Sequence, residues 1–333
     1  MTAFKALLVQ QDVVSKFFTQ EVVERQTEQL SVGEVLVKVH YSSLNYKDAL
    51  SAKGNKGVTK NYPHTPGIDA AGEVVESATK DWQPGDKVIV TGYDLGMDTP
   101  GGFGQYIRVP AKWVLPLPEG ISLHEAMALG TAGLTAALSL TKLQQMGVTP
   151  ESGEIFVTGA SGGVGSLSIA LLAKLGYTVA ASTGKLEQAE YLSQLGATKI
   201  IDREAAFEGV DRPLLPEQWA GAVDTVGGDI LFNVIKSLKY GGSVASCGLV
   251  ASPNFQANVF PFILRGVNWL GIDSVELPLK EKQHMFTKLA NEWRIPSLDK
   301  IVREVTLDEL PHYIESMFKG RLVGRVVVNL TTG

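Results

Sequence analysis

A glycine-rich segment between an apolar run and a helical pattern carries the strongest chemical signal in the chain. Residues 157–165 read VTGASGGVG, with Gly159, Gly162 and Gly165 three residues apart. Glycine allows a tight turn and lets backbone N–H groups approach an anion at the positive end of a helix. Such a turn between a strand and a helix is typical of the pyrophosphate site of a dinucleotide cofactor, the alternative being a purely structural turn. We predict that the cofactor is held by Gly159, Ser161, Gly162, Gly163, Val164 and Gly165.

The residues after the next predicted strand indicate which dinucleotide binds. NAD sites usually place Asp or Glu about 20 residues after the first glycine, where it holds the ribose hydroxyls. Here that strand ends in Ser182, Thr183, Gly184 and Lys185, with no acidic residue. Hydroxyl groups and an ammonium suit the 2′-phosphate of NADPH, as does Arg203 after the third strand. We therefore predict NADPH as the cofactor, the alternative being a solvated helix start with an incidental lysine.

Strands and helices alternate around this turn, between about residues 123 and 276. The run 155–158 reads IFVT and is apolar almost without alternation, as expected of a strand covered on both faces. The alternation predicts an α/β fold with a doubly wound parallel sheet. The predicted strands are 155–158, 178–182, 199–201, 221–225 and 243–247, and the predicted helices are 125–146, 164–175, 185–195 and 229–238.

The first 122 residues have a different texture, with short strands separated by stretches rich in glycine and proline. This pattern predicts a small β-barrel or sandwich. Residues 122–125 read SLHE, which resembles a capping box at the start of a helix. We predict a β-rich domain, 1–122 completed by 277–333, and a nucleotide-binding domain, 123–276. The β-rich domain has predicted strands 6–9, 34–40, 71–76, 87–91, 106–109 and 325–330, and predicted helices 281–291 and 307–318.

Composition narrows the classes of function. The 333 residues include 30 Lys and Arg against 35 Asp and Glu, and the net charge of −5 argues against a broad nucleic-acid surface. The single cysteine, Cys247, cannot close an intrachain disulfide or supply a zinc site that needs several thiolates. The chain has no secretory signal pattern, and we find no apolar run that approaches the length of a membrane span. These features predict a cytoplasmic protein with no membrane or nucleic-acid partner.

Two classes of dehydrogenase have a glycine turn of this kind. Residues 158–165 also fit the T-G-x-x-x-G-x-G pattern of short-chain dehydrogenases, which use a Tyr-x-x-x-Lys catalytic pair. None of the nine tyrosines is followed by lysine four residues later; Tyr46, for example, is followed by Leu50. The nucleotide strand also begins near residue 155 rather than near residue 10. The short-chain class is therefore excluded.

The chain resembles the medium-chain dehydrogenase/reductase superfamily in several segments. They are PGIDAAG at 66–72, PGDKV at 84–88, GFGQY at 102–106 and GTAGLTA at 130–136. Zinc members of the superfamily carry a Gly-His-Glu segment where this chain has Gly67, Ile68 and Asp69, and they carry a four-cysteine loop. The chain is therefore similar to the zinc-free quinone-oxidoreductase branch. Within that branch, SSLNYKDAL at 42–50, TGASGGVG at 158–165, AVDTVG at 222–227 and PFILR at 261–265 resemble bacterial acrylyl-CoA reductases.

The resemblance implies a GroES-like β-rich catalytic domain, a Rossmann domain and a reductase without a metal. Hydride from NADPH would reach an activated C=C bond, most simply that of a short 2-enoyl-CoA such as acrylyl-CoA. The resemblance places Tyr46 beside the nicotinamide as a hydrogen-bond or proton donor and Thr131 near the same ring. It lets Asn45 orient the substrate or the cofactor ribose. It also adds Leu249 and Arg325 to the cofactor-binding residues.

Two other functions stay open. The same site could serve an NADPH:quinone oxidoreductase. A structural or regulatory protein could instead bind NADPH without turnover, although binding alone would not need the Asn45-Tyr46 pair. The basic loop 53–60, with Lys53 and Lys56, is either a contact for CoA phosphates, helped by Lys47 and Arg265, or a solvated surface.

Three further expectations concern single sites. Asp69 replaces the acid of the zinc segment and is expected to be structural, accepting hydrogen bonds from turn amides. Cys247 is expected to be a buried packing thiol. Relatives usually pair the strand that corresponds to residues 267–274 across a two-fold axis, and the apolar residues 269–272 are compatible with such a homodimer.

Overall fold

The computed structural model describes residues 2–332 and contains two compact units. Within this range, the first comprises residues 2–131, 275–290 and 300–332, and the second comprises 132–274 and 291–299. These limits differ from the predicted domain limits, because the long helix α2 (Leu123–Gln145) contributes to both units instead of starting the second. The predicted division into a catalytic and a cofactor-binding domain stays a prediction.

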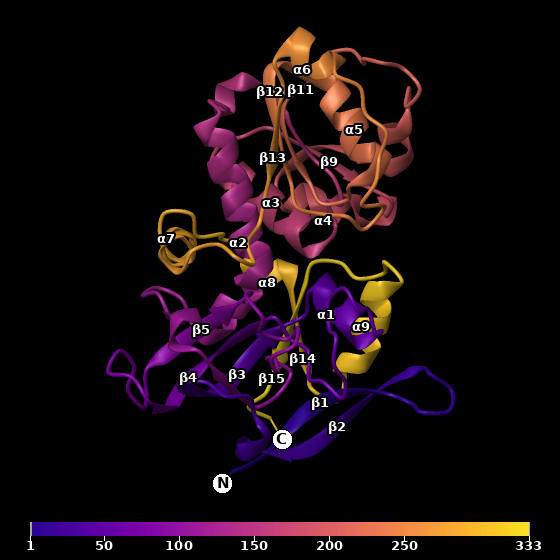
Figure 1. Ribbon diagram of the computed structural model, residues 1–333. Helices are drawn as coiled ribbons and strands as arrows, with labels where there is room; N and C mark the ends of the chain where they lie inside the picture. The colour runs from indigo at the N-terminus through magenta and orange to yellow at the C-terminus, as the bar shows by residue number, and fades with distance from the viewer. Residues whose placement is uncertain (1, 333) are drawn as a thin grey trace. The chain divides into compact units, whose positions relative to one another are not determined.

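The first unit is built on a seven-stranded mixed sheet (Figure 1). Its order is β14-β15-β3-β4-β5-β7, with β6 paired to β3, and every pair except β14–β15 is antiparallel. Side chains from both ends of the chain fill its core, including Val37, Val88 and Val328. The strands are β3 (Val35–Ser43), β4 (Asp69–Ser77), β5 (Lys87–Thr91), β6 (Tyr106–Val109), β7 (Val114–Pro116), β14 (Val302–Thr306) and β15 (Arg325–Asn329).

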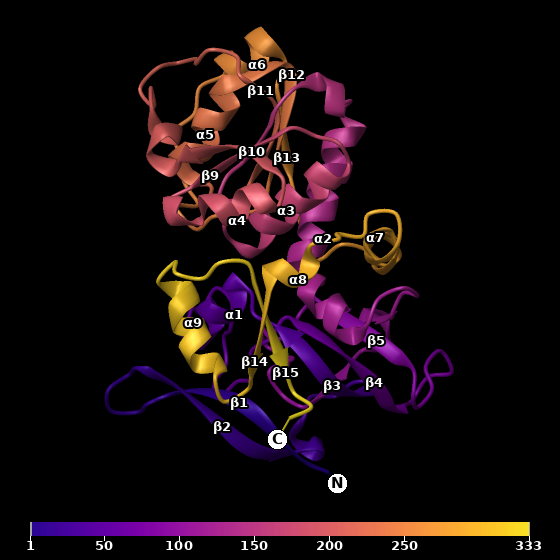
Figure 2. The same ribbon diagram turned by 180° about the vertical axis from the view of Figure 1, so that it is seen from behind.

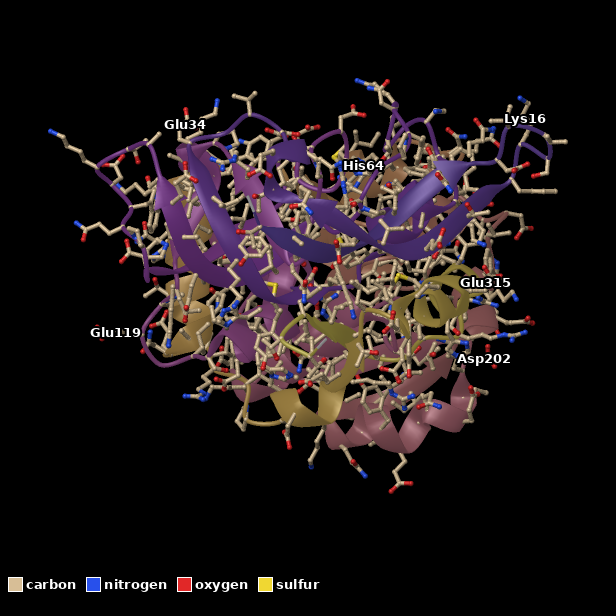
Figure 3. The ribbon with its side chains drawn as sticks, turned by 90° about the horizontal axis from the view of Figure 1, so that it is seen from below. Lys16, Glu34, His64, Glu119, Asp202 and Glu315 are labelled. Carbon is tan, nitrogen blue, oxygen red and sulfur yellow. The ribbon has the colours of Figure 1, made fainter. Side chains whose placement is uncertain are left out.

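A separate hairpin of β1 (Ala3–Gln11) and β2 (Phe18–Gln26) completes the β-structure of this unit. Its far end carries Lys16 (Figure 3). Strand β2 was not predicted: it is half-buried, and polar side chains separate Phe18 from Val22 and Val23. The short strands β7 and β14 and the short helix α1 (Tyr46–Ala52) were not predicted either. The remaining helices of the unit are α7 (Leu279–Ala290), α8 (Leu298–Ile301), of which only the last two residues belong here, and α9 (Leu310–Phe318).

Helix α7 belongs to the first unit through a buried lysine. Lys282 Nζ donates to the carbonyl oxygens of Thr91 and Val275 at 2.7 and 2.8 Å and lies 3.4 Å from the centre of the Tyr93 ring. A buried ammonium is tolerated when polar groups and an aromatic face replace its water. These contacts tie residues 275–290 to the end of β5.

The second unit is a six-stranded sheet whose pairs are all parallel (Figure 2). The order β10-β9-β8-β11-β12-β13 is the 3-2-1-4-5-6 order of a doubly wound nucleotide-binding sheet, as predicted. Every predicted strand and helix of this region is present, within a few residues. The strands are β8 (Ile155–Val157), β9 (Val179–Thr183), β10 (Ala197–Asp202), β11 (Trp219–Asp224), β12 (Leu238–Ser246) and β13 (Asn268–Gly271); the helices are α3 (Gly163–Lys174), α4 (Ala189–Gln194), α5 (Gly228–Ser237) and α6 (Phe260–Arg265).

Helix α2 begins with the predicted capping box. Ser122 N–H donates to the Glu125 carboxylate at 2.8 Å, and Glu125 N–H donates to Ser122 Oγ at 3.1 Å. In length and composition α2 is able to span a membrane, with a mean hydropathy of 1.2 over 18 residues, contrary to the expectation from the sequence. However, 83% of that window is buried within the protein, as in the core helix of a folded domain.

Candidate active site

Tyr46 is the first residue of helix α1, and it is half-buried. The helix starts here because Asn45 is extended (φ −122°, ψ 161°) and its N–H donates to Asp48 Oδ2 at 2.8 Å. The Tyr46 hydroxyl makes no hydrogen bond to any of residues 2–332. Its donor is therefore available to a bound molecule.

Asn45 has no spare polar group in its side chain. Its Nδ2 donates to Asp69 Oδ2 at 2.8 Å and to the Ser43 carbonyl at 3.2 Å. Its Oδ1 accepts a hydrogen bond from Arg325 Nη1 at 3.1 Å. The predicted contact of Asn45 with substrate or ribose would require one of these bonds to break, so the geometry favours a supporting role at the start of α1.

Arg325 is fully engaged as well. It is 3% exposed, and its five N–H donors are directed at Ala128 O, Leu44 O, Asn45 Oδ1, Ser43 Oγ and Met127 O, at 2.7–3.5 Å. Burial lowers the pKa of the guanidinium, and the nearby charges of Asp69 and Asp48 oppose that shift. All five donors of Arg325 are used in this arrangement, so a contact with the cofactor, which remains a prediction, would require one of these bonds to break.

Asp69 is the acceptor at the centre of this cluster. It is fully buried, and its Oδ2 accepts from Ser43 Oγ at 2.7 Å as well as from Asn45. Thr131 donates twice to Asp69, from N–H to Oδ2 at 2.9 Å and from Oγ1 to Oδ1 at 2.6 Å. Because the Thr131 hydroxyl proton points at Asp69, Oγ1 can offer a cofactor only its lone pairs.

A break in helix α2 brings Thr131 to Asp69. Gly130 has φ 49° and ψ −152°, a conformation that residues with a Cβ rarely adopt. A Cβ at Gly130 would also lie 2.5 Å from Asp69 Oδ2 and 2.7 Å from Ser43 Oγ. Glycine at this position is therefore required for the Thr131 N–H to turn toward the carboxylate.

Asp48 belongs to the same buried cluster, although it was not among the predicted site residues. Its Oδ1 accepts from the backbone N–H groups of Gly67 and Ile68 at 3.1 and 2.9 Å, and its Oδ2 accepts from Asn45 N–H. Burial, followed by the charge of Asp69, raises the pKa of Asp48 to about 7. Asp69 is structural, as expected, and accepts one backbone N–H, that of Thr131. The amides of Gly67 and Ile68 are held instead by Asp48, because α1 brings its carboxylate to that turn. The three-residue spacing of Asn45 and Asp48 was the signal that could have revealed it.

The residues present do not fit a zinc ion. Among residues 2–332, no group of three or more His, Cys, Asp or Glu side chains could hold a metal. Asp48 and Asp69 already accept several hydrogen bonds each. Cys247 is half-buried in the second unit, where burial raises the pKa of its thiol to about 12 and its Sγ lies 3.5 Å from Asp224 O. That environment agrees with the expected packing role for the thiol.

The second unit provides the predicted glycine turn between β8 and α3. Gly159 has φ +58°, and a Cβ there would collide with Thr225 Oγ1. A Cβ at Gly165 would collide with the Gly159 carbonyl. Helix α3 begins at Gly163, with extended Gly162 before it, so its first N–H groups lie at the carboxyl end of the sheet. The turn thus has the close packing and the helix start that fit a pyrophosphate.

Most of the predicted 2′-phosphate residues lie beside this turn. Thr183 Oγ1 is 3.2 Å from Ser161 Oγ and accepts from Lys185 N–H at 3.0 Å. A Cβ on Gly184 would lie 3.0 Å from Arg203 Cζ, so the guanidinium packs on that glycine. Burial lowers the pKa of Lys185, and the charge of Glu187 opposes the shift. Ser182 is buried, with its carbonyl accepting from Ala160 N–H, whereas Leu249 is 53% exposed.

The basic loop 53–60 is occupied by contacts of its own unit. Lys53 forms an ion pair with Glu315 of α9. Lys56 donates to Lys60 O at 2.8 Å and lies 4.6 Å from the centre of the Tyr62 ring. In the second unit, Arg265 donates to carbonyls at 2.7–3.3 Å. These contacts favour a structural surface over a contact for CoA phosphates.

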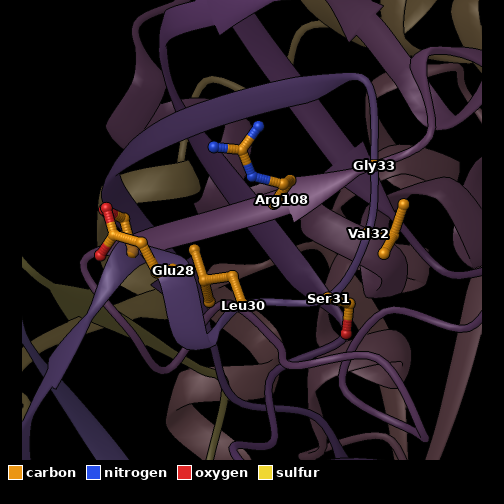
Figure 4. Close-up of a pocket in the computed structure, with 7 residues that line it drawn as sticks. Glu28, Leu30, Ser31, Val32, Gly33 and Arg108 are labelled. Carbon is orange, nitrogen blue, oxygen red and sulfur yellow. The ribbon is translucent and has the colours of Figure 1, made fainter. Parts of the chain in front are cut away.

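One surface hollow of the first unit, about 320 Å³ in volume, contains none of the predicted site residues (Figure 4). Arg108 projects over it and pairs with Glu76 at 3.3 Å. The hollow is open to solvent, and we assign it no role in the site. It is lined by Thr27, Glu28, Leu30, Ser31, Val32, Gly33 and Arg108.

The two units together have the architecture of a medium-chain dehydrogenase/reductase. Residues 31–119 match the family described as alcohol dehydrogenase GroES-like domain, and residues 163–292 match the family described as zinc-binding dehydrogenase. The chain belongs to the medium-chain dehydrogenase/reductase superfamily, in the group of the acrylyl-CoA reductases and the related bacterial quinone oxidoreductases. It is therefore an oxidoreductase, and the predicted family, fold class and enzyme class are confirmed.

The relatives that carry this conclusion cover nearly the whole chain. Acrylyl-CoA reductase AcuI of Ruegeria pomeroyi is 46% identical over 98% of this chain and 99% of its own. The putative quinone oxidoreductase YhfP of Bacillus subtilis is 47% identical over 91% and 92%. Two solved structures each have a TM-score of 0.95: the YhdH oxidoreductase of Salmonella enterica in complex with NADP (39% identity, 98% and 100% covered) and B. subtilis YhfP with NAD bound (44% identity, 99% and 100% covered).

Proposed function

We propose that this oxidoreductase uses NADPH to reduce the C=C bond of a short 2-enoyl-CoA such as acrylyl-CoA. The observation that carries the proposal is Tyr46, a half-buried phenol whose donor has no partner among residues 2–332. The start of its helix is held by a buried polar cluster. The names of the acrylyl-CoA reductases at 46% and 40% identity support the substrate class.

The glycine turn and the residues beside it are assigned to the cofactor. The N–H groups at the start of α3 would hold the pyrophosphate, and Thr183, Lys185 and Arg203 would hold the 2′-phosphate. A Salmonella relative was solved with NADP and an Escherichia coli relative with NADPH, which supports this choice. B. subtilis YhfP was solved with NAD, so the preference between the two cofactors is the point to measure.

Tyr46 is assigned to the substrate carbonyl. NADPH, when bound, supplies a hydride for the β-carbon of the substrate. Negative charge then develops on the thioester oxygen, and a hydrogen bond from the Tyr46 hydroxyl stabilises it. The α-carbon takes its proton from Tyr46 or from water, which completes the addition of one hydride and one proton. Asn45 and Asp48 hold the first turn of α1 and thereby the position of the phenol. Thr131 Oγ1 is assigned to accept a hydrogen bond from the cofactor, since its own proton is directed at Asp69.

The test is NADPH oxidation with a panel of acceptors at saturating NADPH. We expect acrylyl-CoA to be reduced with a higher kcat/KM than free enals or small quinones. Product analysis should find propionyl-CoA with the hydride hydrogen on the β-carbon. Absence of turnover with every enoyl-CoA would refute the assigned substrate class.

A quinone reductase is the second candidate, and the name of B. subtilis YhfP favours it. A quinone takes up one hydride and one proton to become a hydroquinone, and the same unused phenol could serve its carbonyl oxygen. A higher kcat/KM with quinones than with acrylyl-CoA in the same panel would select this function. The third alternative, a protein that only binds the cofactor, is set aside because the family is one of oxidoreductases.

We also propose a cytoplasmic homodimer that acts on a small molecule, with no nucleic-acid or membrane partner. The dimer is assigned to β13, the outer strand of the parallel sheet, whose outer edge pairs with no other strand of residues 2–332. Trp269 of β13 is 49% exposed, and Ile263 and Leu264 of α6 are 69% and 57% exposed. Pairing of two β13 strands would extend the sheet and cover these apolar side chains.

A further inference from the structure

An irregular surface loop follows Arg203, and helix α5 holds it. The loop starts as a 3₁₀-helical turn, Arg203–Phe207, and continues to residue 218, with most of its residues exposed. An exposed stretch without strand or α-helix pairing depends on other contacts to fix its shape. Two side chains of α5, Asn233 and Lys236, are nevertheless 2% and 1% exposed, and both are turned to this loop.

Asn233 holds the end of the 3₁₀ turn. Its Nδ2 donates to the carbonyl oxygens of Ala206 and Glu208 at 2.8 and 3.1 Å. Both carbonyls belong to backbone that has no strand partner in the described part of the chain. One buried amide therefore fixes the backbone three residues after Arg203.

Lys236 holds the next part of the loop. Its ammonium donates to the carbonyls of Gly209, Val210 and Arg212 at 3.1, 2.8 and 3.0 Å, which uses all three of its N–H donors. A buried ammonium is costly unless each donor is satisfied, so the loop cannot leave these positions without leaving a charge unsolvated. Asn233 and Lys236 are three residues apart on α5 and thus lie on one face of the helix. We refer to Asn233 and Lys236 as the α5 clamp.

The other end of the loop carries the guanidinium assigned to the cofactor. Asp202 pairs with Thr183 in the register of β10 and β9, and its Oδ1 accepts from Glu204 N–H at 2.9 Å. Arg203 follows directly and packs on Gly184. The backbone of the turn that carries Arg203 is thus fixed by the sheet on one side and by the α5 clamp on the other.

We infer that Asn233 and Lys236 are positioning residues for cofactor selectivity: by holding the loop after Arg203, they keep its guanidinium where it can bind the 2′-phosphate of NADPH. The inference rests on the proposed role of Arg203. Neither residue of the α5 clamp touches the cofactor, so their effect should pass through Arg203 and should be specific to the 2′-phosphate.

The test measures the Kd of NADPH and of NADH on the purified full-length protein by titration calorimetry. Lys236→Met is expected to raise the Kd of NADPH about tenfold, the usual effect of losing one charged hydrogen bond, here that between Arg203 and the 2′-phosphate. The Kd of NADH should change by less than about twofold. Lys236→Arg, which keeps the charge and the donors, is expected to restore most of the selectivity. Ser237→Ala is the matched control, because Ser237 Oγ is also buried on α5 but bonds only the carbonyls of Asn233 and Val234.

A double variant shows whether the effect passes through Arg203. In the Arg203→Ala background, Lys236→Met should raise the Kd of NADPH no further. An equal effect on NADPH and NADH, or a full effect in the Arg203→Ala background, would overturn the inference. If circular dichroism shows that Lys236→Met does not fold, the same Kd measurements are made on Asn233→Ala. This variant removes two of the five hydrogen bonds between the α5 clamp and the loop.

The same data separate this inference from the proposed function. If Arg203→Ala weakens NADPH alone and the variants of the α5 clamp do not, only the inference about the clamp is wrong. If Arg203→Ala changes neither Kd, the assignment of Arg203 to the 2′-phosphate fails together with the clamp. In both cases the reduction of enoyl-CoA remains testable with the panel of acceptors.

Discussion

Asp69 and Arg325 face each other at 3.9 Å inside the first unit, and two neutral side chains bridge them. Ser43 Oγ donates to Asp69 and accepts from Arg325, both at 2.7 Å. Asn45 donates to Asp69 from Nδ2 and accepts from Arg325 on Oδ1. Ser43 and Asn45, which precede Tyr46 in the chain, are thus held between the buried Asp69 carboxylate and the buried Arg325 guanidinium.

Arg325→Met tests the structural role of this pair. It should lower the free energy of unfolding by about 3–5 kcal/mol, because it leaves the Asp69 carboxylate buried without its countercharge. Urea denaturation of the purified protein measures the change. Arg321→Met, at an exposed arginine of the same unit, should change it by less than about 0.5 kcal/mol. Equal effects of the two substitutions would contradict the structural role of Arg325.

Tyr46→Phe tests the proposed hydrogen-bond donor. Turnover of acrylyl-CoA should fall by about 10²–10³, the usual effect of removing one donor to a developing oxyanion. The Kd of NADPH should stay nearly unchanged, since the ring is retained. Tyr41→Phe removes another half-buried phenol hydroxyl of the first unit and should leave turnover intact. If Tyr46→Phe also retains full turnover, Tyr46 has no part in the reaction.

Asp48 predicts a pH dependence of stability. Its pKa is raised from an ordinary 3.8 to about 7 in the folded protein, so the folded state binds this proton more tightly than the unfolded state does. The unfolding free energy therefore falls as the pH rises from about 4 to about 7, because over this range the folded state holds a proton that the unfolded state has lost. Above about pH 7 both states have lost it, and this contribution no longer changes with pH. The difference in unfolding free energy between the wild type and Asp48→Asn should follow this curve; a difference that does not vary from pH 5 to pH 8 would refute it.

Gly130→Ala tests the break in helix α2. The new methyl group would meet Asp69 Oδ2 and Ser43 Oγ and would demand φ 49° from alanine, so we expect a loss of more than about 3 kcal/mol in unfolding free energy. Gly147→Ala is the matched control. It has φ 81°, but nothing lies within 4 Å of its Cβ position, so only the backbone strain of about 1 kcal/mol is expected. Similar losses in the two variants would show that contact with Asp69 is unimportant.

Trp269→Glu tests the proposed dimer. A charge at this exposed position of β13 should disfavour pairing of two copies, because a carboxylate covered by the partner without a countercharge is costly. Light scattering after gel filtration should find a dimer for the wild type and a monomer for the variant. Tyr240→Glu, at another exposed aromatic residue of the same unit, should remain dimeric. A wild-type protein that is monomeric at micromolar concentration would refute the dimer.

The sequence by itself determined the parallel sheet and its glycine turn, because both follow from local patterns. An unbroken apolar run such as 155–158 fits a strand covered on both faces, and a glycine at each of three spaced positions fits a strand-to-helix turn. Resemblance of the segment around Asn45 and Tyr46 then indicated the class of enzyme. Strand β2 and the short helix α1 were not predicted, because neither has an apolar periodicity strong enough to indicate an element from its own sequence.

Only the tertiary structure decided which polar side chains are free and which are committed. Tyr46, Asn45 and Arg325 were all predicted for the site. The donors of Asn45 and Arg325 are used within the buried cluster, on Asp69, Asn45 and Ser43. The Tyr46 hydroxyl, in contrast, has no partner in the described chain. The spacing of Asn45 and Asp48 can indicate a cap at the start of α1, but the bonds of Asp48 to the 67–68 turn became visible only in the tertiary structure. The same holds for the bonds of Lys236 to its loop. Hydrogen bonds between distant segments depend on how the sheet and helices pack, and no local pattern of residue types specifies them.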